Sequence, residues 1–317
     1  MSVYNGAATL AATMDSILSQ KGVDFEFIVI DDGSTDGGDA ILDHYAQRDG
    51  RVRVIHQENT GLTRALIRGC AEARGQYIAR QDAGGDVSLP GRLARQFAFL
   101  ESNPTVALTS CGTRFVGPEG EFLYEMVKQG DELQRGLEQL RIDQIRGPSH
   151  HGSTMFRRAA YQCVGGYRAE FQVAQDLDLW MRLAEAGRCV ATPELLYQAS
   201  WQPGSISHLR REQQVLATRA IFECCTRRQR GESEQPVLDY LVTKLAEQAK
   251  MWNAPHGLIE ARFYYFLGSI LARRDSKISH YYFRKAVKSW PWHIKAWFKI
   301  AHIFLHCRIL RLDNILN

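Results

Sequence analysis

Residues 75–90 read Gly75-Gln76-Tyr77-Ile78-Ala79-Arg80-Gln81-Asp82-Ala83-Gly84-Gly85-Asp86-Val87-Ser88-Leu89-Pro90. A short β-prone run, Tyr77 to Ala79, is followed by two carboxylates, Asp82 and Asp86, and Pro90 then opens a helical pattern. In open α/β sheets, ligands bind beyond the carboxyl ends of the strands, and two close carboxylates suit a divalent cation that also holds a phosphate. The alternative is a Gly-rich surface turn that its Asp residues cap.

The chain before this stretch alternates helical and strand patterns. Residues 7–20 carry apolar side chains at helical spacing, and residues 25–30 form a β-prone run. A second helical pattern, a short strand at 53–55 and a third helical pattern at 62–73 lead into the acidic loop. This βαβαβ order predicts an α/β fold with a mostly parallel sheet and helices on both faces.

The N-terminal end of this pattern is short. A first strand should precede Tyr4, and only Met1 to Val3 are present to form it. Because the first strand is usually central in a doubly wound sheet, we expect either that three residues suffice or that the natural start lies upstream and the strand is truncated.

The strand patterns of the chain end near residue 205. A last strand pattern at 190–197 is followed by a Pro203-Gly204 turn, and only helical patterns continue from Arg210. We therefore expect an α/β domain over residues 1–205 and a helical C-terminal region over residues 206–317.

Composition favours a globular protein of the cytoplasm. The chain is 45% hydrophobic and 23% charged, and its net charge of +4 is too small to indicate a nucleic-acid partner. Its seven cysteines show no CxxC or Cys/His ligand spacing, so we expect neither a disulfide framework nor a zinc site. No apolar run of about 18 residues and no basic-then-apolar leader occurs, so we expect no transmembrane span or signal peptide.

Five motifs occur in series: Ser2-Val3-Tyr4-Asn5-Gly6, Ile30-Asp31-Asp32-Gly33-Ser34-Thr35-Asp36, Asn59-Thr60-Gly61-Leu62-Thr63-Arg64-Ala65-Leu66, Tyr77-Ile78-Ala79-Arg80-Gln81-Asp82 and Gln175-Asp176-Leu177-Asp178-Leu179-Trp180. In this order they resemble the family 2 inverting glycosyltransferases of GT-A fold, over about residues 1–205. The resemblance implies a Rossmann-like domain in which three acidic clusters meet at one cleft. That cleft would take a nucleotide base, a metal-bound diphosphate and a general base.

The resemblance assigns nucleotide contacts to four residues. Tyr4 matches the aromatic residue near the base, and Asp32, beside Asp31, matches the carboxylate that accepts a hydrogen bond from a uracil-like N–H. Asp82 matches the first acid of the metal motif. The alternatives are a core-edge aromatic for Tyr4 and an Asx-turn for the Asp31-Asp32 pair.

The metal motif departs from the family pattern. Relatives have Asp-Ala-Asp-Asp, whereas this chain has Gly84 in the third position and one extra residue before Asp86. Losing a carboxylate weakens a site for a hard cation, but the two glycines give the loop freedom to bring Asp86 into the vacant position. We expect Asp82 and Asp86 to hold Mn²⁺ or Mg²⁺.

The resemblance makes Asp176 the catalytic base, which would take the proton of an attacking acceptor hydroxyl. Gln175 stands where many relatives have Glu, and a helix cap is the alternative role for Asp176. His150, His151 and Trp180 are candidate acceptor-site residues. A surface or core histidine is the alternative for the first two.

The helical region carries a partial tetratricopeptide-like pattern between Phe263 and Trp297. Aromatic and basic residues interleave from Arg273 to Lys299, as at an anionic membrane surface or around a lipid-linked acceptor. The alternative is a packed helical hairpin with solvated Lys and Arg.

Together these features predict an inverting glycosyltransferase that uses a nucleotide-diphosphate sugar, uridine-linked, and a carbohydrate or lipid-linked acceptor in surface polysaccharide assembly. We expect it in the cytoplasm, with peripheral contact at the inner face of the membrane. The alternative is a non-catalytic nucleotide-sugar-binding or scaffold protein with a degenerate metal loop. A dinucleotide-dependent oxidoreductase is disfavoured because no GxGxxG follows an early strand.

Overall fold

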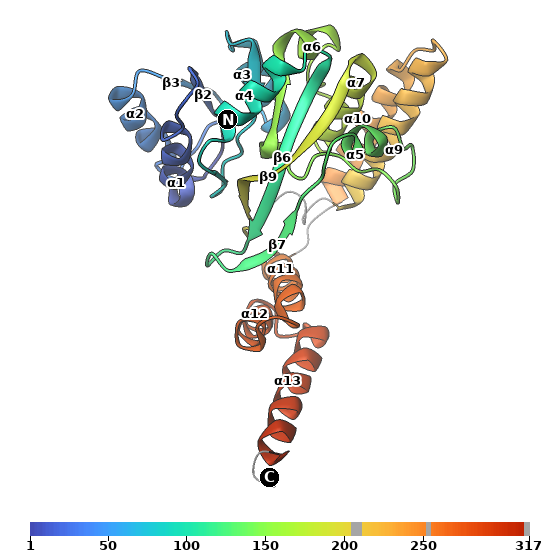
Figure 1. The fold of residues 1–317 in the computed structure, drawn as a ribbon. Coiled ribbons are helices and arrows are strands. Elements are labelled where there is room, and N and C mark those ends of the chain that lie inside the picture. The colour runs from blue at the N-terminus through green and yellow to red at the C-terminus, as the bar shows by residue number, and fades with distance from the viewer. Residues whose placement is uncertain (204–210, 252–254, 314–317) are drawn as a thin grey trace. The chain divides into compact units, whose positions relative to one another are not determined.

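The computed structural model describes residues 1–203, 211–251 and 255–313 (Figure 1). The chain forms two compact units. The first contains Met1–Phe115, Tyr124–Ser200 and Glu212–Gln248, and the second contains Val116–Leu123, Trp201–Arg211 and Ala249–Asn317. The predicted domain boundary at residue 205 lies outside the described residues, so the division into residues 1–205 and 206–317 stays a prediction.

The first 116 residues contain β1 Ser2–Val3, α1 Ala7–Leu18, β2 Phe27–Asp31, α2 Gly38–Arg48, β3 Val52–His56, α3 Leu62–Ala71, β4 Tyr77–Ala79, β5 Val87–Ser88, α4 Arg92–Ser102 and β6 Val106–Val116. They are followed by β7 Phe122–Met126, α5 Glu132–Leu137, β8 Thr154–Arg157, α6 Arg158–Cys163, α7 Gln175–Ala186, β9 Arg188–Ser200, α9 Arg211–Gln229 and α10 Gln235–Met251. The last helices are α11 His256–Leu271, α12 Ser276–Ser289 and α13 Ile294–Asp313. The α/β fold class and the helical C-terminal region are confirmed.

Strand direction differs between the two sheets of the first unit. The N-terminal sheet has the order β1-β2-β3 with parallel pairs, in which Ser2 lies opposite Ile30 and Phe27 opposite Val52. The second sheet has the order β4-β8-β6-β9-β5, and its β4–β8, β6–β8 and β5–β9 pairs are antiparallel. The expected parallel arrangement therefore holds for the N-terminal sheet. The second sheet contains antiparallel pairs, so the strands of the first unit are mixed in direction.

One short connection, between β6 and its partner β7, rules out a parallel pair. β6 and β7 are joined by the turn Gly117–Glu121, which Gly117 N–H closes by donating to Glu121 O at 2.8 Å. A parallel pair needs a crossover of a dozen or more residues, which this turn cannot supply. The sequence pattern of a strand does not reveal its direction, because buried parallel and antiparallel strands can both appear as apolar runs.

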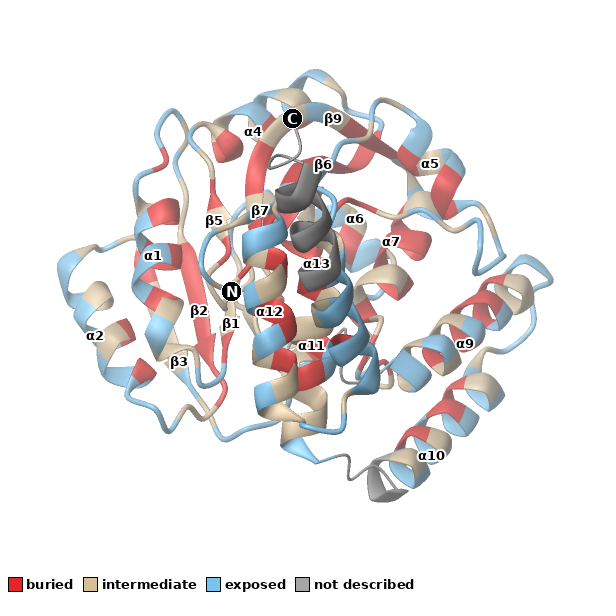
Figure 2. Cartoon of the chain, turned by 90° about the horizontal axis from the view of Figure 1, so that it is seen from below, coloured by how far each residue is buried: buried red, intermediate tan, exposed pale blue. Residues whose placement is uncertain are grey.

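Several apolar cores hold the first unit together, and two of them pack the elements described next. All five residues of β2 are buried, and α1 packs Leu10, Met14 and Ile17 against that sheet. The larger core joins Phe156 of β8 and Leu179 of α7 to apolar side chains of α9 and α10. Figure 2 shows buried residues along α9 and α10. Because α9 and α10 cover the helix that carries Asp176, their packing helps to position the candidate site.

The second unit contains the tip of the β6–β7 hairpin and the last three helices. Asp275 caps α12 by accepting hydrogen bonds from the backbone N–H groups of Lys277 and Ile278, both at 2.9 Å. Gly268 of α11 lies against Phe283 of α12, and a Cβ there would come within 2.8 Å of that ring. The tetratricopeptide-like assignment stays a prediction. In the described part of the chain, no helix combines the length and the apolar character that crossing a bilayer requires.

Candidate functional site

The loops that follow β1 and β2 are tied together by side chains. Asn5 Oδ1 accepts from the Thr35 N–H at 2.8 Å, and Asp36 Oδ2 accepts from the Ala7 N–H at 2.8 Å. Asn5 adopts a left-handed backbone conformation with φ of 50°, which Asn tolerates better than most residues. Tyr4 is 56% exposed at this junction, so its ring is open to a ligand.

Asp31 and Asp32 are both buried and both hydrogen-bonded. Asp31 accepts from Ser34 N–H at 3.0 Å and contacts His56 Nδ1 at 2.8 Å. Burial alone would raise the pKa of Asp31, but these hydrogen bonds outweigh it and lower the pKa. The bond to Ser34 closes a local turn of the kind that the sequence left as the alternative for this pair.

Asp32 anchors the loop that opens α3. Its Oδ1 accepts from Thr60 N–H at 2.9 Å and Gln57 Nε2 at 2.7 Å, and its Oδ2 accepts from Gly61 N–H at 2.8 Å. Two residues further on, Thr63 Oγ1 donates to Phe171 O at 2.8 Å. Asp32 therefore stabilises a loop that is linked directly to the segment preceding α7.

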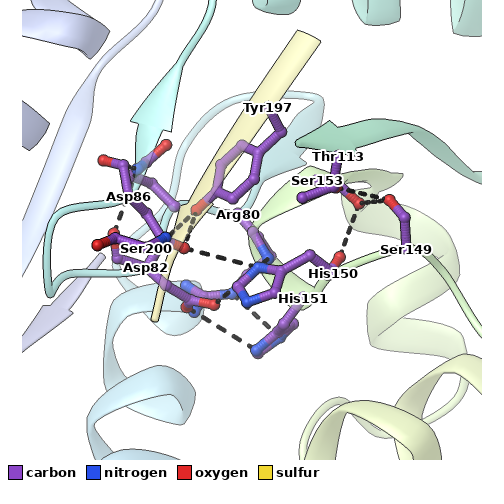
Figure 3. Close-up of polar contacts among 12 residues, drawn as sticks. Arg80, Asp82, Asp86, Thr113, Ser149, His150, His151, Ser153, Tyr197 and Ser200 are labelled. Atoms are coloured by element: carbon purple, nitrogen blue, oxygen red, sulfur yellow. Dashed lines mark hydrogen bonds and ion pairs between the residues drawn. The ribbon is translucent and has the colours of Figure 1, made fainter. Parts of the chain in front are cut away.

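Asp82, Asp86 and His150 form the centre of the candidate site. Each offers one ligand atom, and these atoms all lie within 4.8 Å of one another (Figure 3). His150 Nδ1 is 3.8 Å from Asp82 Oδ2 and 3.6 Å from Asp86 Oδ2. These separations are too long for hydrogen bonds, so the three groups surround a common point without bonding to one another.

Strand pairing brings these residues together. β4 pairs with β8, which places the loop after Ala79 beside the segment that precedes Met155. β5 pairs with β9, which places Val87 opposite Gln198 and the end of the acidic loop beside Tyr197. The acidic loop also contacts the N-terminal half, because Ala83 packs against the core of the first sheet.

Three groups that the sequence analysis missed support the two carboxylates. Arg80, buried at the end of β4, donates to Asp82 Oδ1 at 2.6 Å. Tyr197 donates its hydroxyl to Asp86 Oδ2 at 2.8 Å, and Ser200 N–H donates to Asp86 Oδ1 at 2.9 Å. Strand-end arginines are usually solvated, and a tyrosine in β9 carries no sequence signal for a site.

Gly152 makes room for this arrangement. A Cβ on Gly152 would lie 1.9 Å from the hydroxyl of Tyr197, so only glycine allows that hydroxyl to reach Asp86. The Tyr197 ring also stacks on the His150 ring, with centroids 5.5 Å apart and planes 22° apart. Gly152 and Tyr197 thus help to orient both His150 and Asp86.

The two carboxylates differ in their affinity for protons. Burial raises the pKa of Asp86 to about 6, and the charge of Asp82 adds to the effect. Burial acts in the same direction on Asp82, but His151, Arg80 and His150 more than offset it and lower its pKa to about 2. The charged form of Asp86 is therefore disfavoured beside Asp82. A bound cation would stabilise that charged form.

His151 is a supporting residue with a defined tautomer. Its Nε2 accepts from Arg80 Nε at 3.2 Å and from the Tyr167 hydroxyl at 2.7 Å, so the proton resides on Nδ1, which faces Asp82 Oδ1 at 3.9 Å. Burial first, and then Arg80, lowers the pKa of His151 to about 3, so the ring is neutral. Trp180, which is also buried, packs edge-on against it with ring centroids 6.0 Å apart.

Asp176 lies in the first turn of α7, close to this centre. The chain enters the helix through Ala174, which has a left-handed φ of 56°. Asp176 Oδ1 accepts only the neighbouring Leu177 N–H among the described hydrogen bonds, at 2.9 Å. Burial raises its pKa, and the charge of Asp82 raises it further while His150 lowers it, so these three side chains are within electrostatic reach of one another.

Asp178, two residues further along α7, has a different environment. It is 1% exposed and forms ion pairs with Arg168 and with Arg182, whose Nε atoms lie 3.1 Å and 3.2 Å from its Oδ2. Arg168 also pairs with Glu234 at the start of α10, at 2.6 Å. Asp178 therefore connects α7 to its neighbours and does not face the carboxylate centre.

The residues present fit a divalent cation. Two carboxylates and an imidazole are a common set of ligands, and imidazole favours Mn²⁺ over Mg²⁺ because it is the softer ligand. Asp82, Asp86, His150, His151, Asp176 and Trp180 thus gather in one region, whereas Tyr4, Asp31 and Asp32 end the first two strands of the neighbouring sheet.

Comparison with known proteins identifies the family of this chain. Residues 1–165 match the family model described as glycosyl transferase family 2. A putative glycosyltransferase EpsE of Bacillus subtilis is 34% identical over 206 residues, which cover 62% of this chain and 70% of that protein. The O-antigen biosynthesis glycosyltransferase WbnJ of Escherichia coli is 30% identical over 188 residues, 58% of this chain and 69% of the relative.

The fold is also similar to a solved structure. The mannosyltransferase PcManGT from Pyrobaculum calidifontis, in complex with GDP-Man and Mn²⁺, superposes with a TM-score of 0.53. The match covers 92% of this chain and 86% of that one, at 19% identity. At this identity the likeness shows a shared GT-A type of fold.

Proposed function

The chain belongs to glycosyl transferase family 2, and from that premise we propose that it transfers a sugar from a nucleoside-diphosphate donor to an acceptor hydroxyl with inversion at the anomeric carbon. The observation that carries this proposal is the centre of Asp82, Asp86 and His150, together with the position of Asp176 on α7, the helix whose Trp180 packs against His151. A base and a cation site side by side are what such a transfer needs.

The donor in this proposal is a UDP-sugar. Tyr4, with an exposed ring, and the carboxylates of Asp31 and Asp32 lie at the ends of β1 and β2 and would contact the nucleoside. Asp32 Oδ2 accepts one described hydrogen bond, from Gly61, and a carboxylate oxygen has two lone-pair directions. One acceptor position thus remains for the N–H of a uracil-like base.

The leaving diphosphate would be held by the carboxylate centre. Asp82, Asp86 and His150 would bind Mn²⁺ or Mg²⁺, and the bound cation would neutralise charge on the departing phosphate. Arg80 donates to Asp82 Oδ1 and helps to lower its pKa, so it would keep this carboxylate ionised and oriented for the cation. Asp176 would accept the proton of the acceptor hydroxyl on the opposite side of the sugar.

The proposed acceptor follows from the relatives of this chain. One relative bears a name from O-antigen biosynthesis, which supports a carbohydrate or lipid-linked acceptor in surface polysaccharide assembly. Of the three proposed acceptor-site residues, His150 has a partly exposed side chain, whereas His151 and Trp180 are buried and would position the site without touching the acceptor. We place the protein in the cytoplasm, at the inner face of the membrane.

Donor hydrolysis tests the proposed activity directly. With Mn²⁺ present, we expect slow release of UDP from a panel of UDP-sugars without any acceptor, because water can replace the acceptor hydroxyl. Release would be followed with a coupled nucleoside-diphosphate assay, and a sample stripped of metal by a chelator serves as the control. No release from any donor that calorimetry shows to bind would contradict the proposal.

That negative result would support the alternative, a binding protein without catalysis. The observation in its favour is that both oxygens of Asp86 already accept hydrogen bonds, from Tyr197 and Ser200, while Gly84 stands where relatives have a carboxylate. A loop stabilised in this way could hold a nucleotide sugar without activating it. Binding of UDP-sugar with no turnover distinguishes this alternative from the enzyme.

Metal affinity provides a second expected result. Asp86→Asn should weaken Mn²⁺ binding at least about tenfold, because loss of even an outer partner of a metal ligand costs that much. His150→Ala should weaken Mn²⁺ binding more than Mg²⁺ binding, because imidazole is the softer ligand. Calorimetric titration with each metal measures both effects, with Asp39→Asn, an exposed carboxylate of α2, as the matched control. Equal affinities in the wild type and Asp86→Asn would exclude Asp86 as a ligand.

A further inference from the structure

The N-terminal part of α13 exposes apolar side chains along one face. Ile294, Trp297 and Phe298 are 67%, 51% and 71% exposed, and Ala301, one turn further, is exposed too. At 3.6 residues per turn, these positions lie on a single side of the helix. Trp292, just before the helix, is 80% exposed. Figure 2 shows this part of α13 mostly in the colour of exposed residues.

The opposite side of α13 already has partners. Ala296 is fully buried in a small core with Ala261 of α11 and Ala286 of α12. His293 lies against the ring of Tyr265 with centroids 5.0 Å apart. The exposed aromatic face is therefore not the face that holds the helix in its own unit, and the fold does not need it for packing.

Basic residues flank the exposed face. Lys295 and Lys299 lie one turn apart on α13 and are both exposed, and Lys288 at the end of α12 is exposed as well. The sequence contains no Asp or Glu from residue 276 to residue 312, where it contains eight Lys and Arg. This part of the chain is thus strongly positive although the whole chain carries only +4.

We propose that this face of α13, with Trp292, Trp297 and Phe298 as apolar contacts and Lys288, Lys295 and Lys299 as charged contacts, docks on an anionic lipid bilayer. Amphipathic helices bind membrane interfaces with aromatic side chains in the headgroup region and lysines beside them. Each basic residue near an anionic surface adds to the attraction. The helix would lie in the plane of the interface.

This inference adds a surface to the proposed location and does not depend on the proposed transfer chemistry. If it holds, the protein works at a surface that carries lipid-linked acceptors. Donor hydrolysis in the absence of lipid reports on the enzyme alone, so failure of either proposal can be recognised independently of the other.

Co-sedimentation of the full chain with vesicles tests the docking. We expect binding to vesicles of phosphatidylcholine with about one third phosphatidylglycerol, and weak binding to phosphatidylcholine alone. Higher salt should weaken the binding because it screens the charges. The double variant Trp297→Ser/Phe298→Ser and the double variant Lys295→Glu/Lys299→Glu should each lower the partition coefficient at least about tenfold.

A matched control distinguishes binding through this surface from nonspecific binding through any exposed apolar residue. Tyr240 and Val242 of α10 are 56% and 43% exposed, so Tyr240→Ser/Val242→Ser removes two exposed apolar side chains elsewhere on the chain. This control should bind vesicles like the wild type, and all variants should melt and hydrolyse donor like the wild type without lipid. Three results would overturn the proposal: wild-type binding that ignores lipid charge, unchanged binding of Trp297→Ser/Phe298→Ser, or a dimer in solution that this variant dissociates.

Discussion

Asp176→Asn should lower kcat for sugar transfer by a factor of about 100 to 10,000, the range that a general base contributes, while donor binding stays near that of the wild type. The substitution keeps the size of the side chain and removes its ability to accept a proton. The charges of Asp82 and His150 act on Asp176, but its carboxylate accepts only a neighbouring backbone N–H among the described hydrogen bonds, so its loss should not release the donor site.

Calorimetry with a UDP-sugar in Mn²⁺ and steady-state transfer assays measure the two effects separately. Folding stability should hold or rise slightly in Asp176→Asn. The raised pKa of Asp176 means that its charged form is disfavoured in the folded state, so at neutral pH the neutral amide removes an unfavourable charge. Turnover close to that of the wild type would show that another group takes the proton.

The same substitution two residues further along should act on stability instead. Asp178→Asn should lower the free energy of unfolding by about 3 kcal/mol, because it removes the carboxylate that pairs with the buried Arg182 and leaves Arg168 with Glu234 alone. Urea unfolding followed by circular dichroism measures this change. Per folded molecule, transfer activity should remain within a few fold of the wild type.

These two variants form a matched pair. They change the same residue type in the same turn of α7, so a difference between them cannot come from the helix alone. Loss of stability in Asp176→Asn together with loss of activity in Asp178→Asn would reverse the assignment of the two carboxylates. Equal losses of both properties in both variants would indicate that the N-terminal turn of α7 is structural.

Much of the molecule was predictable from local sequence. The helices and strands before residue 103 follow apolar spacing, and the acidic loop follows a strand as expected. Directions of the later strands were not predictable in this way. Thr154–Arg157 runs antiparallel to both β4 and β6, and its apolar run would look the same in a parallel sheet.

In the candidate site, too, the sequence identified residues, and the structure showed which of them lie together. Asp82, Asp86, His150, His151 and Asp176 were singled out from the sequence, but His150 was expected at the acceptor and the structure places its Nδ1 between the two carboxylates. Arg80 was in the acidic stretch and carried no signal, because arginines are rarely fully buried. Its burial follows from a partner on another element, the ring of His151.

The sequence by itself determined the order of the elements, the family and the identity of most candidate site residues, because helix and strand periodicity, turn residues and motifs are properties of near neighbours along the chain. The tertiary structure alone decided which side chains meet. Pairing of β4 with β8 and of β5 with β9 brings Asp82 and Asp86 to His150 and Tyr197. The pKa values of the carboxylates then follow from burial and from those distant charges, which no local pattern encodes.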